Sequence, residues 1–401
     1  MKKEEYLKAF AKDSKNWCFN FAPGRIEFLG NHLDYNGGDV LGMAVNAGIY
    51  CLGIPHSEKQ ALGISEEKNQ FSLFSESFED AQLISCLDDI EHQSGKFAWT
   101  NYCLGVLKEL QERDLAPSQG FRLIFTTDLP TSVGLSSSAA LELASALTLL
   151  QLAEKSLPTK ELAILCRAAE NQFVGLPCGI LDQGTSAFGK KDHLVHIDCD
   201  KEIFSNLPIP SDTQVWIFNT GIKHDLVDSL YSTRHQECQD ALKIGRKKYP
   251  EKQKLADFRL DEIELLGLPE NLKKRALHVC NEQARVNQFK EGLASNLSAE
   301  KLGKLLAKSH QSSSQNFENS CTELDFLAEK LNQLPGVLGA RLTGGGFGGA
   351  VMAWTRSTFN EKDANGISNK YKEEFDKDIE YHHFLPSDGA RKEDLLRKSP
   401  S

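Results

Sequence analysis

Four short segments concentrate the residue types that carry out phosphate and sugar chemistry. The first is Gly134-Leu-Ser-Ser-Ser138, which is followed at once by an apolar sequence that favours a helix. The first turn of a helix has backbone N–H groups without intrahelical partners and a partial positive charge. Small side chains let a polyphosphate reach these groups, and serine hydroxyls can also ligate Mg²⁺. An ordinary serine cap on a core helix is the alternative interpretation.

Two further segments carry charged side chains beside turn residues. Arg25, His32 and Asp34 crowd together in PGRIEFLGNHLD, a polar concentration typical of sugar recognition, although a solvated loop would look similar. Asp182 follows a Pro/Gly turn in PCGILDQ and has apolar neighbours. A buried aspartate is costly unless it is paired or catalytic. The alternative is an aspartate that caps the next helix.

The fourth segment, GGGFGG, matches the pattern G-x-G-x-x-G at Gly344, Gly346 and Gly349. A dinucleotide site would need a strand before this pattern and a helix after it. Strand-like AVMAW follows instead, so the match does not indicate a dinucleotide site. The sequence also lacks G-x-x-x-x-G-K-[ST], H-R-D and D-F-G, which removes the support for a P-loop protein or a protein kinase.

The composition is that of an acidic globular protein. The 401 residues include 46 Lys and Arg against 56 Asp and Glu, a net charge of −10. Such a surface repels phosphate backbones, so we expect no nucleic-acid partner. No apolar run approaches the ~20 residues of a membrane helix, and the N-terminus has no signal-peptide core. Ten scattered cysteines without a C-x-x-C pair favour free thiols. They therefore predict a cytoplasmic location.

The elements that must position these segments mix strands and helices without regular βαβ alternation, which predicts an α+β fold. The helix that begins near residue 136 is apolar on most faces and is expected at a domain centre. Strands are expected at 17–21, 39–54, 121–125 and 215–220, and the first of them should end in a turn at Pro23-Gly24. An exposed hairpin is expected around 71–73. A charged helical region should extend up to residue 332. We place a domain boundary between residues 205 and 206, which gives domains 1–205 and 206–401.

Taken together, the four segments resemble the galactokinase branch of the GHMP kinases. That family's pattern opens with P-G-R-V-N-L-I-G-E-H-T-D-Y-N-G-G, continues with G-x-G-L-S-S-S-A and P-C-G-I-M-D-Q, and closes with T-G-G-G-F-G-G. Related segments occur here in the same order, and the resemblance covers most of residues 17–390. It implies ATP- and Mg²⁺-dependent phosphorylation of the anomeric hydroxyl of galactose or a closely related sugar by a monomer. The implied fold is an N-terminal domain like ribosomal protein S5 domain 2 and a ferredoxin-like C-terminal domain, with the active site between them.

The resemblance also implies roles for individual residues. Asp182 matches the catalytic aspartate, which would act either as a full base or as a positioning group. Arg25 matches the arginine beside that aspartate and would keep its carboxylate ionised. The implied nucleotide contacts are Gly134, Leu135, Ser136, Ser137, Ser138 and Ala139. The implied Mg²⁺ ligands are Ser138 and Glu170, although another serine of the loop could take the place of Ser138. The implied sugar contacts are Asn31, His32, Asp34, Gly179, Tyr231, Gly345 and Gly346.

Most departures from the family pattern fall in the sugar-facing motif. The family's Glu in G-E-H-T-D is Asn31 here, its Thr is Leu33, and its Asn after R-V is Glu27. In the phosphate loop only the first Gly is changed, to Ser132. Because Asn31 removes a negative charge from the implied sugar site, we expect galactose not to be the best substrate. Galacturonate, fucose or arabinose would then be preferred.

Two other functions remain open on the same fold. One is a GHMP kinase for a substrate other than a sugar, such as mevalonate or homoserine. The other is a catalytically silent protein that senses sugar and ATP. A silent sensor would be expected to lose the phosphate loop or the aspartate, whereas GLSSSAA and Asp182 are complete here. The H-x-D-Y-N-G-G remnant favours a sugar over the other substrates.

Overall fold

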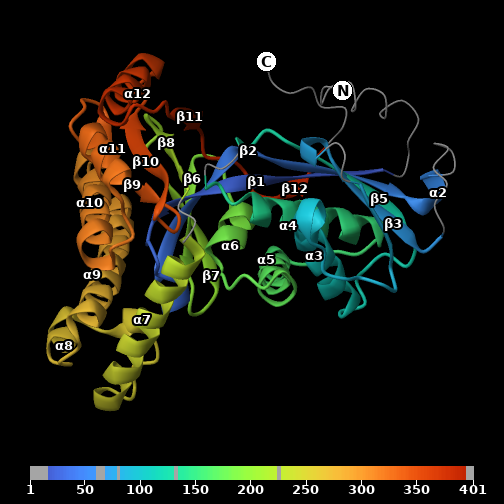
Figure 1. The fold of residues 1–401 in the computed structure, drawn as a ribbon, viewed down its shortest axis with the longest axis horizontal. Helices are drawn as coiled ribbons and strands as arrows, with labels where there is room; N and C mark the ends of the chain where they lie inside the picture. The colour runs from blue at the N-terminus through green and yellow to red at the C-terminus, as the bar shows by residue number, and fades with distance from the viewer. Residues whose placement is uncertain (1–16, 60–67, 79–81, 131–133, 224–226, 394–401) are drawn as a thin grey trace.

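The computed structural model describes residues 17–59, 68–78, 82–130, 134–223 and 227–393. Its strands form two separate sheets (Figure 1). The strands are β1 (Cys18–Leu29), β2 (Asp39–Pro55), β3 (Gln70–Ser75), β4 (Leu83–Cys86), β5 (Phe121–Thr127), β6 (His193–Asp198), β7 (Ile203–Pro208), β8 (Thr213–Lys223), β9 (Val337–Thr343), β10 (Gly348–Arg356), β11 (Glu380–Phe384) and β12 (Arg391–Lys392). The helices are α2 (His56–Lys59), α3 (Asn101–Gln111), α4 (Ser137–Leu152), α5 (Thr159–Ala169), α6 (Leu181–Phe188), α7 (Val227–Lys248), α8 (Leu260–Glu264), α9 (Glu270–Ala294), α10 (Ala299–Ser312), α11 (Thr322–Asn332) and α12 (Glu361–Phe375). This mixture confirms the predicted α+β class.

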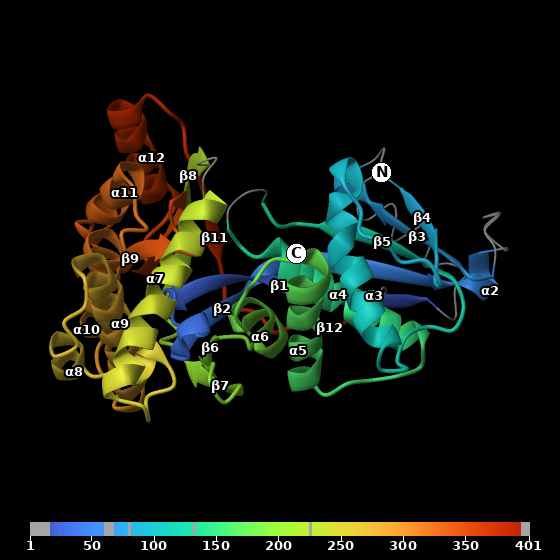
Figure 2. The same ribbon diagram turned by 60° about the horizontal axis from the view of Figure 1, so that its bottom comes forward.

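The first sheet has eight strands, with the main path β12-β1-β2-β5-β3-β4 and with β6 paired to both β2 and β7. Helices α3, α4, α5 and α6 lie together on one face of this sheet (Figures 1 and 2). Helix α4 packs against β1 and β2 and buries most of its residues, as its apolar sequence predicts. Strand β12, near the end of the described chain, returns to pair with β1. Residues far apart in sequence therefore complete one sheet.

Strand β1 departs from the course that its sequence predicts. It continues through Pro23 and Gly24 instead of turning there, with a register shift between Pro23 and Arg25. Such a shift is a β-bulge, which bends a strand without ending it. A Cβ atom on Gly24 would lie 2.9 Å from the carbonyl oxygen of Leu135, so the bulge also brings β1 close to the glycine–serine loop. Arg25 is consequently carried by a paired strand and not by a loop.

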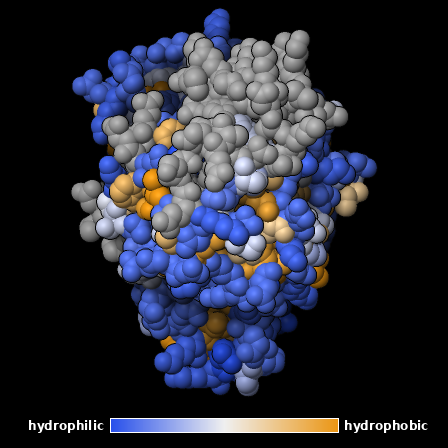
Figure 3. Space-filling model, turned by 90° about the vertical axis from the view of Figure 1, so that its right-hand side faces the viewer, coloured by the Kyte–Doolittle hydropathy of each residue, from blue (hydrophilic) through white to orange (hydrophobic). Residues whose placement is uncertain are grey.

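The hairpin expected around residue 71 is present but buried. Strands β3 and β4 pair antiparallel, while β3 also pairs in parallel with β5, which covers Phe71 and Leu73 inside the domain. The outer surface at this end of the molecule is drawn in Figure 3. Its visible coloured part is mainly hydrophilic, with hydrophobic residues scattered in small groups. That pattern agrees with the charged composition.

The second sheet has four strands in the order β11-β8-β10-β9, and α10, α11 and α12 pack beside it. A glycine-rich turn joins β9 to β10, and β10 contains the strand-like AVMAW segment. The predicted boundary between residues 205 and 206 lies inside β7, which belongs to the first sheet, and the boundary stays a prediction. Among the described residues, no helix combines the length and apolarity that a membrane span requires. All ten cysteines are free thiols.

Candidate active site

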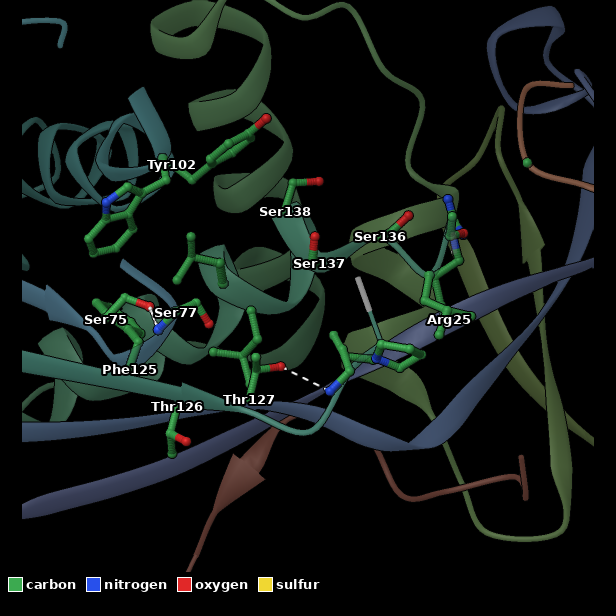
Figure 4. Close-up of a pocket in the computed structure, with 18 of the residues that line it drawn as sticks. Arg25, Ser75, Ser77, Tyr102, Phe125, Thr126, Thr127, Ser136, Ser137 and Ser138 are labelled. Atoms are coloured by element: carbon green, nitrogen blue, oxygen red, sulfur yellow. Dashed lines mark hydrogen bonds between the residues drawn. The ribbon is translucent and has the colours of Figure 1, made fainter. Parts of the chain in front are cut away.

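Two cavities share a wall that is formed by Arg25, Gly344 and Gly345. The larger has a volume of ≈ 570 Å³ and is lined by the start of α4 and by aromatic and hydroxyl side chains. Figure 4 shows the serines at the start of α4 side by side between Tyr102 and Arg25. The smaller cavity has a volume of ≈ 160 Å³, and several charged side chains line it. Its remaining lining residues are Glu27, His32, Asp34, Cys178, Gly179, Leu181, Asp182 and Tyr231.

The glycine–serine loop has an unusual backbone conformation on the wall of the larger cavity. Gly134 has a φ of 72° and Ser136 has a φ of 49°, both in the left-handed region. A non-glycine residue rarely adopts this conformation, and such residues cluster at functional sites. Ser136 directly precedes α4, a helix of 16 residues. The loop therefore delivers the free N–H groups of a helix start to the cavity wall.

Arg25 connects Asp182 to this loop. Its Nε donates to Asp182 Oδ1 at 2.7 Å, and its Nη1 donates to the carbonyl oxygen of Gly134 at 2.9 Å. The Ser136 hydroxyl donates to the other carboxylate oxygen, Oδ2, at 2.5 Å. The Asp182 side chain remains 25% exposed and lines the smaller cavity. The structure thus brings the predicted aspartate, the predicted arginine and the loop together at the junction of the two cavities.

Glu170 lies beside the same loop, where α5 ends in a π-helical turn, Glu170–Val174. Such turns are frequent at functional sites. The Gln183 amide donates to Glu170 Oε2 at 2.6 Å. Burial and then the charge of Asp182 raise the pKa of Glu170, whereas a hydrogen bond with the Ser138 hydroxyl opposes the rise. The two predicted metal ligands, Ser138 and Glu170, are therefore neighbours in the fold.

A second buried glutamate in this cluster is not among the residues predicted from the sequence. Glu142 is 0% exposed, and its Oε2 accepts a hydrogen bond from Gln183 at 3.0 Å. Burial, together with the charge of Glu170, raises its pKa well above the ordinary value. A single charged residue in the apolar run SSSAALELASALTLL is the signal that could have identified it.

The oxygen ligands present suit Mg²⁺. No group of three or more His, Cys, Asp or Glu side chains arranged to hold a metal occurs among the described residues. Mg²⁺, however, usually takes only one or two protein ligands and completes its shell with phosphates and water. The adjacent Ser138 hydroxyl and Glu170 carboxylate provide two oxygens of the required kind. The excess of buried carboxylates around them also favours a cation.

The smaller cavity joins the two sheets through His32. Its Nε2 lies 3.2 Å from the carbonyl oxygen of Gly345, and its Nδ1 lies 2.9 Å from the Tyr35 hydroxyl. The Asn319 amide Nδ2 also lies 3.0 Å from Nε2, so the ring is held by contacts to both of its nitrogens. Burial lowers the pKa of His32 well below its ordinary value, so the ring is neutral. The Tyr231 ring lies 5.5 Å away between ring centroids and forms the next part of the wall.

Asp34 faces the same cavity and is packed against Gly179. A Cβ atom on Gly179 would come within 2.1 Å of Asp34 Oδ2, so any larger residue at this position would displace the Asp34 side chain. The backbone N–H of Tyr35 donates to Asp34 Oδ1 at 2.8 Å. Burial raises the pKa of Asp34 to about 7, and the nearby charges of Asp182 and Glu27 act in the same direction.

Three predicted contact residues line neither cavity. Ala139 is buried in the first turn of α4, Gly346 packs against Asn319, and Asn31 is completely buried. In contrast, Glu27 lines the smaller cavity. The sequence analysis missed its place there, although two residues after Arg25 on a strand means the same face. The expected loss of a carboxylate from this cavity is therefore wrong, because position 27 supplies one. The expectation that galactose is not the best substrate loses its basis with it.

Known proteins resemble this chain in both sequence and structure. It matches the GHMP kinase N-terminal domain over residues 101–190, the GHMP kinase C-terminal domain over 290–377, and the galactokinase galactose-binding signature over 4–55. It is 35% identical to a galactokinase of Thermotoga neapolitana over 92% of this chain and 99% of that protein. Its identity to a galactokinase of Pasteurella multocida is 38%, over 83% of this chain and 84% of that one. The crystal structure of Lactococcus lactis galactokinase complexed with galactose matches with a TM-score of 0.88 and 31% identity, over 97% of this chain and 98% of that one.

Proposed function

Because the chain belongs to the galactokinase branch of the GHMP kinase family, we propose that it phosphorylates the anomeric hydroxyl of galactose with ATP. One observation carries this proposal beyond the family resemblance. Asp182 lies between a phosphate-type loop in one cavity and a polar cavity of sugar size, and Arg25 contacts both. A phosphoryl acceptor held in the smaller cavity would therefore meet a phosphoryl donor held in the larger.

ATP fits the larger cavity by the character of its two ends. Near Tyr102 and Phe125 the walls are aromatic and apolar, which suits a nucleotide base. At the other end, the left-handed turn and the first N–H groups of α4 suit the polyphosphate. We assign Gly134 to Ala139 as the nucleotide loop, with the buried Ala139 acting through its backbone.

The chemical step follows from the contacts of Asp182. Its carboxylate would accept or orient the proton of the C1 hydroxyl, so that the hydroxyl oxygen can attack the terminal phosphorus of ATP. The bond from that phosphorus to the bridging oxygen breaks, and ADP leaves. Arg25 and Ser136 each hold one of its oxygens, which fixes the direction in which the carboxylate faces. The positive charge of Arg25 and the amides of α4 would stabilise the negative charge that spreads over the transferred group.

Ser138 and Glu170 would hold Mg²⁺, which when bound neutralises phosphate charge during transfer. Gln183 donates to Glu170 and so fixes the orientation of that carboxylate toward the site. We also propose that His32, Asp34, Gly179, Tyr231 and Gly345 shape the sugar site. A monomeric state and a cytoplasmic location stay predictions, and light scattering after size exclusion tests the first.

A substrate panel tests the proposed function. ATP consumption would be measured with galactose, glucose, arabinose, fucose, galacturonate, mevalonate and homoserine, and the product would be examined by phosphorus NMR. We expect galactose to give the highest kcat/KM, with the phosphate on C1. A preference for mevalonate or homoserine, or a phosphate on another carbon, would contradict the proposal. Sugar and ATP binding without any turnover would instead indicate a sensor.

A further inference from the structure

The two carboxylate oxygens of Glu27 have different surroundings. Oε1 accepts hydrogen bonds from Arg341 Nη2 at 2.9 Å and from Asn31 Nδ2 at 3.0 Å. Oε2 accepts no hydrogen bond from any residue that the structure describes, although the side chain is only 6% exposed. Because Glu27 lines the smaller cavity, this second oxygen is an acceptor that a ligand in the cavity can use.

The position of Glu27 is fixed from the second sheet. Arg341, on β9, is 0% exposed, and besides its ion pair it donates to the carbonyl oxygens of Glu27 and Phe28. The Thr343 hydroxyl also donates to the carbonyl oxygen of Glu27, at 3.1 Å. Burial raises the pKa of Glu27, and the charge of Arg341 opposes that rise. An acceptor held this firmly is preorganised for a ligand.

Asn31 has no polar atom left for a ligand. Its Nδ2 donates to Glu27 Oε1 and to the carbonyl oxygen of Gly344, at 2.9 Å for the latter. Its Oδ1 accepts from the Ser313 hydroxyl at 3.1 Å and from the Asn319 amide at 3.0 Å. An amide has two donor hydrogens and an oxygen with two acceptor positions, so all are in use. A carboxylate at position 31 would instead face two acceptors.

The family pattern has Asn at the position of Glu27 and Glu at the position of Asn31. In this chain the two residue types are therefore exchanged together. From these contacts we infer, on the basis of the proposed function, that Glu27 is the specificity-determining carboxylate of this enzyme. Its Oε2 accepts a hydrogen bond from a sugar hydroxyl remote from C1. Asn31 does not contact the sugar but positions Glu27.

The strand geometry determines which end of the sugar Glu27 meets. Arg25 and Glu27 lie on one face of β1, about 6.6 Å apart for two residues of strand. Arg25 holds Asp182, where the C1 hydroxyl reacts, so a hexose placed there extends along β1 toward Glu27 and presents its C4 and C6 hydroxyls. Three lining carboxylates against one lining guanidinium also disfavour a uronic acid, since a fourth carboxylate would be repelled.

The test compares wild type with Glu27→Gln, which keeps the side-chain shape and removes the charge. Galactose, 2-deoxygalactose, 4-deoxygalactose and 6-deoxygalactose would be used for calorimetric binding and for kcat/KM. We expect Glu27→Gln to weaken galactose binding about ten- to a hundredfold, the effect of losing a charge-assisted hydrogen bond. The substitution should have little further effect on whichever of the 4-deoxy and 6-deoxy sugars lacks the contacted hydroxyl. The affinity for 2-deoxygalactose should fall by the same factor as the affinity for galactose.

Two further variants separate direct contact from damage to the fold. Glu27→Asp keeps a charge beside Arg341 but withdraws it from the cavity, and we expect the same loss for galactose. The double variant Glu27→Asn with Asn31→Glu restores the family order and should recover most of the activity that Glu27→Asn loses. Asn31→Glu alone should lower both activity and melting temperature. Glu109→Gln, which removes a buried glutamate on α3, serves as the control.

The outcomes for the two proposals are distinguishable. If wild type does not phosphorylate galactose, the proposed function and this inference both fail. If wild type phosphorylates galactose but Glu27→Gln binds it within about twofold of wild type, the inference alone fails. An equal loss of affinity for all four sugars in Glu27→Gln would also overturn the inference, because Glu27 would then have a structural role only. A gain in galactose activity for Asn31→Glu alone would contradict the coupling.

Discussion

The two cavities differ in the kind of group that would bind the ligand. In the larger cavity, the proposed phosphate-binding wall is one continuous segment that ends in the start of α4, and its main donors would be backbone N–H groups. In the smaller cavity, the groups are mainly side chains, which come from β1, the segment that follows β1, α6 and α7, while the β9–β10 turn adds glycine backbone. The first arrangement depends on local conformation, and the second depends on contacts between distant segments.

This difference explains where the chain departs from the family pattern. A backbone site tolerates an exchange of small residues, because the N–H groups stay in place. A side-chain site keeps its hydrogen bonds when two partners change together, as the amide at Asn31 and the carboxylate at Glu27 do. A substitution that looks like a lost function in sequence can therefore be half of an exchange. Variants on each side of Arg25 can test the distinction.

The largest effect is expected at the junction of the two cavities. Asp182→Asn should lower kcat by on the order of 10³-fold, the range of a lost general base. Binding of Mg-ATP should persist, because the nucleotide loop is unchanged. Steady-state kinetics and nucleotide calorimetry measure the two effects. Asp198→Asn, whose side chain pairs with Lys201, should behave as wild type. Turnover near the wild-type rate in Asp182→Asn would remove the residue from the mechanism.

The phosphate side should respond through the metal and not through the sugar. Ser138→Ala and Glu170→Gln should raise the Mg²⁺ concentration for half-maximal rate about ten- to a hundredfold, because each removes an oxygen ligand. The KM for galactose should change little. Titrating Mg²⁺ at saturating ATP tests this, and Ser137→Ala shows whether the neighbouring serine contributes. Ser145→Ala, buried further along α4, is the control. An unchanged metal requirement in both variants would refute the assignment.

The sugar side should respond in the opposite way. Gly179→Ala places a methyl group on the Asp34 carboxylate, so it should raise the KM for galactose roughly tenfold, the scale of 1.4 kcal/mol. The KM for ATP should stay the same. Gly366→Ala, in α12 with open space around it, is the matched control. If Gly179→Ala raised only the KM for ATP, the assignment of ATP to the larger cavity and of the sugar to the smaller one would be contradicted.

The smallest effect concerns stability and has a defined pH dependence. The pKa of Asp34 is raised to about 7 in the folded protein, above the ordinary 3.8. The folded state then holds a proton that the unfolded state loses, so stability falls as pH rises through this interval. We expect Asp34→Asn to raise the free energy of unfolding by about 1–2 kcal/mol at pH 8 and by little at pH 4. The gain stays this small because water in the cavity partly solvates the Asp34 charge.

The measurement for this variant is the free energy of unfolding between pH 4 and 8, alongside galactose kinetics. Activity should fall while stability rises, since a charge buried for function opposes folding. Asp261→Asn, on an exposed turn of α8, should show no such gain. A stabilisation that is equal at pH 4 and pH 8 would show that the ionisation of Asp34 is not its cause.

Residues whose role depends on local chemistry could be predicted from the sequence. The serine loop before an apolar helix and the turn before Asp182 each occupy a few consecutive positions, and the structure places them as neighbours. The turn expected at Pro23 was wrong because β2 keeps its pairing with β1 across the bulge. The place of Glu27 in the smaller cavity was also missed, although its two-residue spacing from Arg25 puts both side chains on one face of the strand.

The sequence by itself determined the α+β class, the buried helix behind the phosphate loop and the family, because each is written in contiguous residues. Only the tertiary structure decided which polar side chains face the smaller cavity. Glu27 faces it because Arg341, more than 300 positions later in the chain, pairs with one of its oxygens, and Asn31 faces away because four partners use its amide completely. A side chain's hydrogen-bonding capacity is fixed by its type, but the partners that use it come from the fold.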